Sequence, residues 1–136
     1  MRSHEETTLV SGAATAGNVV YSYTIPEGRP QQLLFGQVLL TTDATVANRR
    51  VVVGMYDAAG TLIFDSHAGA VVTASLASQH MELMQGVYRE TALVNGTLQI
   101  PIPLDWIFQP SYTIRVSVSA GVAGDSHSSK LVFAAR

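Results

Sequence analysis

Hydrophobic residues along this chain recur in short runs separated by turn-forming residues, a pattern typical of β-strands. The clearest run is SYTIRVSVSA (111–120), which alternates apolar and polar side chains. A period of two places one set of side chains on a buried face and the other on a wetted face. The next run, SKLVFAA (129–135), follows the turn-like GVAGDSH. The two runs are therefore predicted to pair as an antiparallel hairpin.

Two upstream runs are apolar on both faces, which predicts strands buried between two layers. They are LLFGQVLLTT (33–42) and RRVVVGMY (49–56). DAAG (57–60) then leads into TLIFD (61–65), which indicates a hairpin. Further on, the dipeptide Asn95-Gly96 is the strongest short hairpin signal in the chain.

A helical period of 3.6 residues is not sustained anywhere, and LASQHMELM (76–84) is the one candidate for a short helix. Short strands with frequent turns predict an all-β fold, an antiparallel β-sandwich or jelly roll of about 8 strands. Residues 1–16 are small and polar except for Leu9 and Val10. We expect residues 1–16 to form an N-terminal arm that is ordered only when something binds it, and 17–136 to form the jelly-roll domain.

Composition narrows the possible functions. Charged residues make up 13% of the 136 residues, about half the usual share of roughly 25%. So little charge indicates a surface that is largely covered in an assembly, the alternative being a monomer with a Ser/Thr/Ala-rich surface. The net charge of −2 argues against a nucleic-acid partner. No run approaches the roughly 18 apolar residues of a membrane helix, so no membrane partner is expected.

Motifs for catalysis or cofactor binding are missing from the sequence. The chain contains no cysteine, glycine-rich phosphate loop, HExxH helix, G-x-S-x-G elbow or EF-hand loop. The N-terminal MRSHEETTLVSGAAT lacks the apolar core of a signal peptide, so export by such a peptide is not expected. We therefore expect neither an enzyme nor a cofactor.

The tripeptide Asp-Ser-His occurs twice, as Asp65-Ser66-His67 and as Asp125-Ser126-His127. Three consecutive residues cannot adopt the geometry of a catalytic triad. In an extended chain the Asp and the His of each copy share a face, so two neighbouring copies could offer four metal ligands. The simpler interpretation, which we favour, is that these polar residues end turns and cap backbone donors.

The stretch TTDATVANRRVVV (41–53) places two of the eight Lys and Arg residues side by side. Its first half has the composition of a turn. Arg49 and Arg50 then begin a strand and point to opposite faces. We expect one to close over the end of the sandwich, pairing with a carboxylate or backbone carbonyls, and the other to face solvent or a partner. A catalytic cation is disfavoured because no base or nucleophile accompanies it.

Two longer segments carry a resemblance to a known group of proteins. They are LLFGQVLLTTDATVANRRVVVGMYDAAGTLIF (33–64) and IPIPLDWIFQPSYTIRVSVSAGVAGD (100–125). Their order of strands and turns resembles small virion proteins of tailed bacteriophages, loosely over residues 20–133. One departure is Gln109-Pro110, where Pro-Gly or Ala-Gly is expected, which leaves the shape of that turn open.

The resemblance implies a jelly-roll capsid cement or decoration protein, made in the host cytoplasm and bound to the capsid exterior. It implies two partners, the major capsid protein and further copies of the chain in a dimer or trimer. The alternative is a receptor- or glycan-binding module of a tail or head fibre, with Trp106 or Tyr88 in a groove. A metal-dependent enzyme built on the two Asp-Ser-His copies is a third, weaker hypothesis. The expected interaction residues are Leu9, Val10, Asp43, Asn48, Arg49, Arg50, Met81 and Met84.

Overall fold

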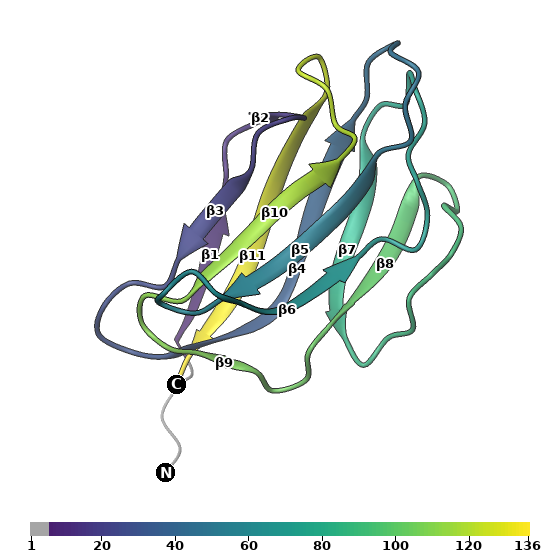
Figure 1. Ribbon diagram of the computed structural model, residues 1–136. Helices are drawn as coiled ribbons and strands as arrows, with labels where there is room; N and C mark the ends of the chain where they lie inside the picture. The colour runs from purple at the N-terminus through teal and green to yellow at the C-terminus, as the bar shows by residue number, and fades with distance from the viewer. Residues whose placement is uncertain (1–5) are drawn as a thin grey trace.

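The computed structural model describes residues 6–136, which form two β-sheets packed face to face (Figure 1). These residues contain eleven strands. Sheet A has seven strands: β1 (Thr7–Ser11), β2 (Thr15–Ala16), β4 (Gln31–Thr41), β7 (Gln79–Gln85), β8 (Thr97–Ile102), β9 (Ile107–Phe108) and β11 (Ser126–Ala135). Sheet B has four strands: β3 (Tyr21–Thr24), β5 (Arg50–Tyr56), β6 (Leu62–His67) and β10 (Thr113–Ser119).

The strand order identifies the architecture. Sheet A is ordered β1-β11-β4-β7-β8, and sheet B is ordered β3-β10-β5-β6. Eight strands remain when the two-residue strands β2 and β9 and the strand β8 are left out. Counted along the chain, sheet A then contains the first, eighth, third and sixth of these strands, in that spatial order. Sheet B contains the second, seventh, fourth and fifth. Two Greek keys wound together in a jelly roll produce this arrangement. The predicted all-β jelly roll is confirmed, and β8 extends sheet A by pairing in parallel with β7.

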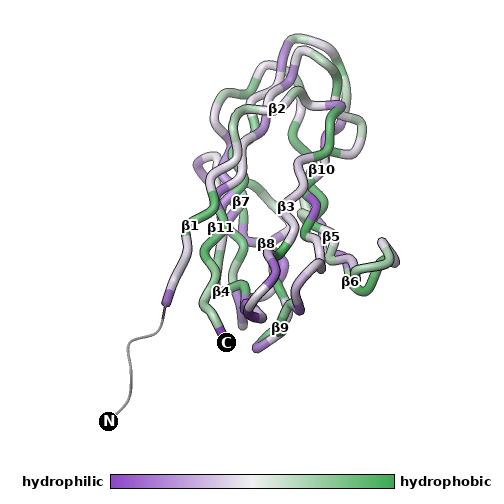
Figure 2. The backbone as a smooth tube through the Cα atoms, turned by 90° about the vertical axis from the view of Figure 1, so that its left-hand side faces the viewer, coloured by the Kyte–Doolittle hydropathy of each residue, from purple (hydrophilic) through white to green (hydrophobic). Residues whose placement is uncertain are grey.

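The core lies between the two sheets, which Figure 2 shows as separate layers. On β10 the predicted alternation holds, because Ile114, Val116 and Val118 are buried and their neighbours are more exposed. Phe133 of β11 is fully buried and contacts the rings of Phe108 and Tyr23 at centroid distances of 6.1 and 5.3 Å. Side chains that alternate along each strand thus fill one shared interior.

The N-terminal segment differs from the expected arm. Residues 1–5 lie outside the described residues, but Thr7–Ser11 forms β1 and pairs antiparallel with β11. Val10 packs against the core, whereas Leu9 points outward. The segment is therefore a jelly-roll strand. Its small polar residues concealed this because an edge strand buries few side chains.

The C-terminal hairpin prediction is wrong. β10 belongs to sheet B and β11 to sheet A, so the connection at 120–125 crosses between the layers. Period-two alternation identifies the buried face of a strand but not the strand beside it. The hairpin predicted around DAAG is confirmed, because β5 and β6 pair antiparallel.

Two further local predictions need correction. The candidate helix at 76–84 is mostly strand β7, whose buried and less buried side chains alternate. Asn95-Gly96 does form a tight turn with φ of 51° and 72°, but only Val94 and Thr97 pair across it. The chain then continues as β8 in parallel with β7, so no extended hairpin forms.

Candidate interaction surfaces

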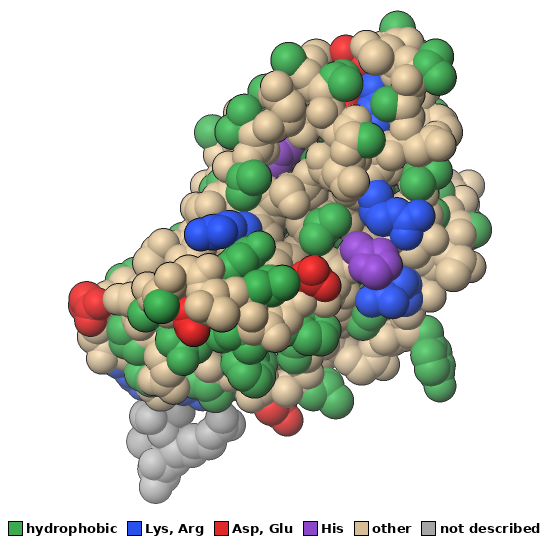
Figure 3. Space-filling view, viewed as in Figure 1, with side chains coloured by type: hydrophobic (Ala, Val, Ile, Leu, Met, Phe, Trp, Pro, Cys, Tyr) green, Lys and Arg blue, Asp and Glu red, His purple; other side chains and the backbone are tan. Residues whose placement is uncertain are grey.

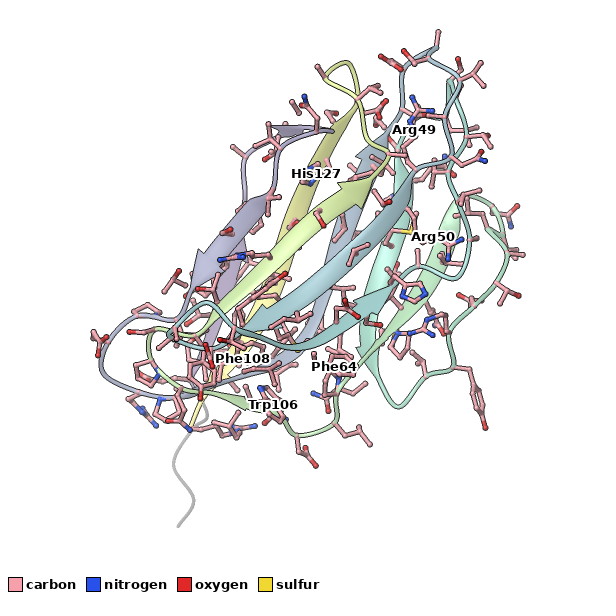
Figure 4. The ribbon with its side chains drawn as sticks, in the orientation of Figure 1. Arg49, Arg50, Phe64, Trp106, Phe108 and His127 are labelled. Atoms are coloured by element: carbon pink, nitrogen blue, oxygen red, sulfur yellow. The ribbon has the colours of Figure 1, made fainter. Side chains whose placement is uncertain are left out.

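The segment 42–49 connects β4 to β5 at one end of the sandwich, where Figure 4 shows Arg49. Arg49 directly precedes β5, and its side chain is fully buried. Its Nε and Nη2 donate to the two carboxylate oxygens of Asp125 over 2.9 and 3.0 Å. Nη2 also donates to Asp43 Oδ1 at 3.0 Å, and Nη1 donates to the carbonyl of Ala47 at 3.0 Å. The guanidinium thus ties together the two loops at this end.

Asp125 lies in the connection between β10 and β11 and is buried. Its carboxylate also accepts the backbone N–H groups of Asp43 and Val122 at 2.9 and 3.0 Å. Burial alone would raise the pKa of this carboxyl. The hydrogen bonds from Arg49, Val122 and Asp43, together with the charge of Arg49, outweigh burial and hold the pKa below its usual value. A charged, fully hydrogen-bonded carboxylate is a structural anchor.

The two adjacent arginines therefore have different environments. The expectation that one of them pairs over the end of the sandwich is confirmed for Arg49. Its inclusion among the interaction residues is wrong, because its side chain exposes no surface. Arg50 is half-buried and donates from Nη1 to the carbonyl of Ala68 at 3.2 Å. Asn48 is exposed and Asp43 is half-buried. Contact of Arg50, Asn48 and Asp43 with a partner stays a prediction.

An apolar row crosses the outer face of sheet A, the face turned away from the core. Leu9 is in register with Val132, Val132 with Phe35, Phe35 with Met84, and Met84 with Pro101. Residues that are directly opposite on paired strands share a face. We call these five residues the outer-face row. Leu9, Phe35 and Met84 are 61%, 52% and 37% exposed.

The outer-face row contains two of the expected interaction residues and excludes two others. Leu9 and Met84, 75 positions apart in the sequence, lie on the same face, whereas Met81 is fully buried and Val10 packs on the core. Met81 and Val10 were expected to be interaction residues, but both face the core. Sequence reasoning missed Phe35, because the run 33–42 is apolar on both faces and its register with other strands is not visible in the sequence.

A second apolar surface lies where the β6 edge of sheet B approaches the segment after β8. It is a groove of about 330 Å³ between the two sheets, with Phe64 and Trp106 near one another in Figure 4. Figure 3 shows hydrophobic side chains gathered in the lower part of the molecule, where this groove lies. We call it the β6 groove. Its lining residues are Ile63, Phe64, Ser66, Arg89, Pro101, Ile102, Pro103 and Trp106.

The two Asp-Ser-His copies do not converge. One lies on β6 in sheet B, whereas the other begins just before β11 in sheet A, and Asp125 is engaged by Arg49. Within residues 6–136, no group of three or more His, Asp or Glu side chains is placed to hold a metal ion. The same residues contain no helix long and apolar enough to cross a membrane.

Comparison with known proteins supports the fold. No protein-family model and no curated protein sequence matches the chain. Among solved structures, a chain of infectious bursal disease virus, Gx strain, matches with a TM-score of 0.52, 15% identity and 97% coverage of this chain. The VP2 subviral particle of the same virus matches with a TM-score of 0.48, 16% identity and 96% coverage.

This chain spans about a third of the length of both viral chains, covering 32% of each. At sequence identities of 15% and 16%, the similarity to these viral chains is a similarity of fold. The fold is a jelly roll that resembles part of the chain in the infectious bursal disease virus structure.

Proposed function

We propose that this chain is a structural virion protein, a cement or decoration protein that stabilises a tailed-phage head by bridging capsid subunits from outside. Its partners are the major capsid protein and other copies of the chain. The outer-face row carries the proposal, because it exposes apolar side chains across five strands of a well-packed domain. Contiguous apolar surface of this kind marks a contact surface.

Bridging requires contact surfaces that face in different directions. The outer-face row lies on sheet A, and the β6 groove opens beside the edge of sheet B, so the two surfaces meet at Pro101 but extend in different directions. Apolar area buried at subunit junctions stabilises the assembled shell over the free subunits. Many copies on one shell then add up modest individual affinities. The jelly-roll fold, which resembles part of a viral chain, and the sequence resemblance to phage virion proteins support the same function.

The test is co-purification with virions from cultures that express the chain, followed by quantitative mass spectrometry. We expect the wild-type chain in the particle fraction at a fixed ratio to the major capsid protein. Phe35→Ser should lower that ratio several-fold because it removes apolar contact area. Val20→Ser is the matched control, since Val20 is also 50% exposed but lies outside both surfaces. Wild-type chain found only in the soluble fraction would contradict the proposal.

A second candidate function is a receptor- or glycan-binding module of a tail or head fibre. The observation in its favour is that Trp106 and Phe64 line the same groove, because aromatic rings can stack on apolar ligand faces. Glycan-array binding that Trp106→Ala abolishes would favour this function over the first. Tyr88→Ala is the control, since Tyr88 is 94% exposed and does not line the groove.

A further inference from the structure

A second row of side chains lies two residues away from the outer-face row on the same face of sheet A. In this row Lys130 of β11 is opposite Gln37 of β4, and Gln37 is opposite Glu82 of β7. Lys130 is exposed and Glu82 is half-buried. Neither forms a salt bridge within residues 6–136. Because β4 separates them by two strand spacings, about 10 Å, they are too far apart to pair with each other.

The positions of these charges are related by the symmetry of the sheet. β4 is the middle strand, with β11 and β1 on one side and β7 and β8 on the other. A two-fold axis parallel to β4, placed above the outer face, exchanges β11 with β7 and β1 with β8. The rotation therefore brings a second copy face to face with the first and places the partner's Glu82 opposite Lys130. The same rotation also places Lys130 of the second copy opposite Glu82 of the first, so the pair forms twice.

We infer that the outer face of sheet A binds a second copy of this chain, with two reciprocal Lys130–Glu82 pairs. The same rotation places Phe35 against Phe35 of the second copy, Val132 against Met84, and Leu9 against Pro101. Every member of the outer-face row then meets an apolar residue. Such an interface is isologous, as expected of a symmetric dimer, and the sheets pack aligned about 10 Å apart.

The positions of Lys130 and Glu82 favour a second copy of this chain as the partner, and they favour a two-fold axis parallel to β4. A two-fold axis perpendicular to the strands would also stack the outer-face row on itself, but it would leave Lys130 and Glu82 away from each other. A depression of about 280 Å³ on this face, lined by Leu9, Phe35, Val132, Lys130 and Glu82 among others, can receive side chains of the second copy. Apolar contacts and charge pairs thus occupy one continuous surface.

This inference names one partner of the surface that carries the proposed function, and it rests on that function in treating the face as an assembly surface. The aligned apolar residues supply the buried area, and the two charge pairs specify the register and orientation of the copies. Capsid contacts of the dimer are then made by the remaining surfaces, including the part of each β6 groove beyond Pro101 that Phe64 and Trp106 line.

Sedimentation velocity on the isolated full chain tests the inference by charge reversal. The wild-type chain should sediment as a dimer. Lys130→Glu and Glu82→Lys should each raise the dimer Kd at least about tenfold, because each change opposes like charges twice in the dimer. The double variant K130E/E82K should return the Kd to near the wild-type value, because it restores opposite charges at both sites.

Arg29→Glu is the control, since Arg29 forms an exposed pair with Glu6 away from this face and should leave the Kd unchanged. Circular dichroism would verify that each variant folds. A wild-type chain that stays monomeric, or a double variant no tighter than the single ones, overturns the inference. A dimer that is missing from virions contradicts only the proposed function, whereas a monomer found in virions contradicts only this inference.

Discussion

At the scale of single residues, the Arg49–Asp125 pair has a large effect on stability. Both side chains are fully buried. Taking two charges out of water is costly, and their hydrogen bonds offset that cost only while both partners are present. Asp125→Asn should therefore lower the free energy of unfolding by about 3–5 kcal/mol in urea titrations. Glu6→Gln, in the exposed pair with Arg29, should change it by less than about 0.5 kcal/mol.

The same pair predicts a dependence of stability on pH. The folded-state pKa of Asp125 lies below its ordinary value, so the folded protein holds this proton less tightly than the unfolded chain. The linked stability is present above the ordinary Asp pKa, about 3.9, and is lost as pH falls through the lower folded-state pKa. In thermal melts, the advantage of wild type over Asp125→Asn should be constant near neutral pH and shrink below about pH 4. A constant difference down to pH 2 would argue against the ion pair as its source.

How much of this site the sequence predicts depends on sequence distance. The turn composition and the opposite faces of the two arginines are local properties, and both can be read from residues 41–53. The principal partner of Arg49 lies 76 residues further along the chain. The sequence contains five aspartates, most of them next to turn-forming residues, and nothing in their spacing distinguishes Asp125 from the others. Its selection requires the crossover that brings the two loops together.

At the scale of elements, the edge strand β1 is the part whose role differs most from the expectation. It covers the free side of β11 over Lys130–Ala134. Removing residues 1–11 should therefore lower the melting temperature and promote aggregation, because an uncovered strand edge pairs with other chains. Melting curves and light scattering would measure both effects. Leu9→Ser keeps the strand and should leave the melting temperature close to that of wild type. An unchanged melting temperature in the truncated chain would show that β1 contributes little to the fold.

Strand existence was more predictable than strand pairing. The alternation in 111–120 and the apolar runs at 33–42 and 49–56 all correspond to strands. Pairing is decided by non-local burial, so β10 and β11 entered different sheets although a turn-like segment connects them. The segment at 76–84 failed for a related reason, since its apolar residues fit a helix or a strand and packing against β4 and β8 decided between them.

At the scale of the whole molecule, the jelly roll separates residues that hold the fold from residues that are available to partners. The long strands β4 and β11 of sheet A send alternate side chains to the core and to the outer face. Charged residues are scarce, at 13%, and the outer face keeps an apolar row. The sequence pattern alone assigns core residues and partner-accessible residues to strands, but it does not tell them apart. Only the register shows that Leu9, Phe35 and Met84 form one surface.

This separation makes opposite predictions for two phenylalanines. Phe133 is fully buried between the sheets, and Phe133→Ala should lower the free energy of unfolding by about 3–5 kcal/mol because it leaves a cavity. Phe35 is 52% exposed, and Phe35→Ala should change that free energy by less than about 0.5 kcal/mol while weakening self-association. Urea unfolding at a concentration where the chain is monomeric measures stability, and sedimentation at higher concentration measures association. Comparable stability losses in both variants would mean that Phe35 packs within the fold, and would remove it from the interaction surface.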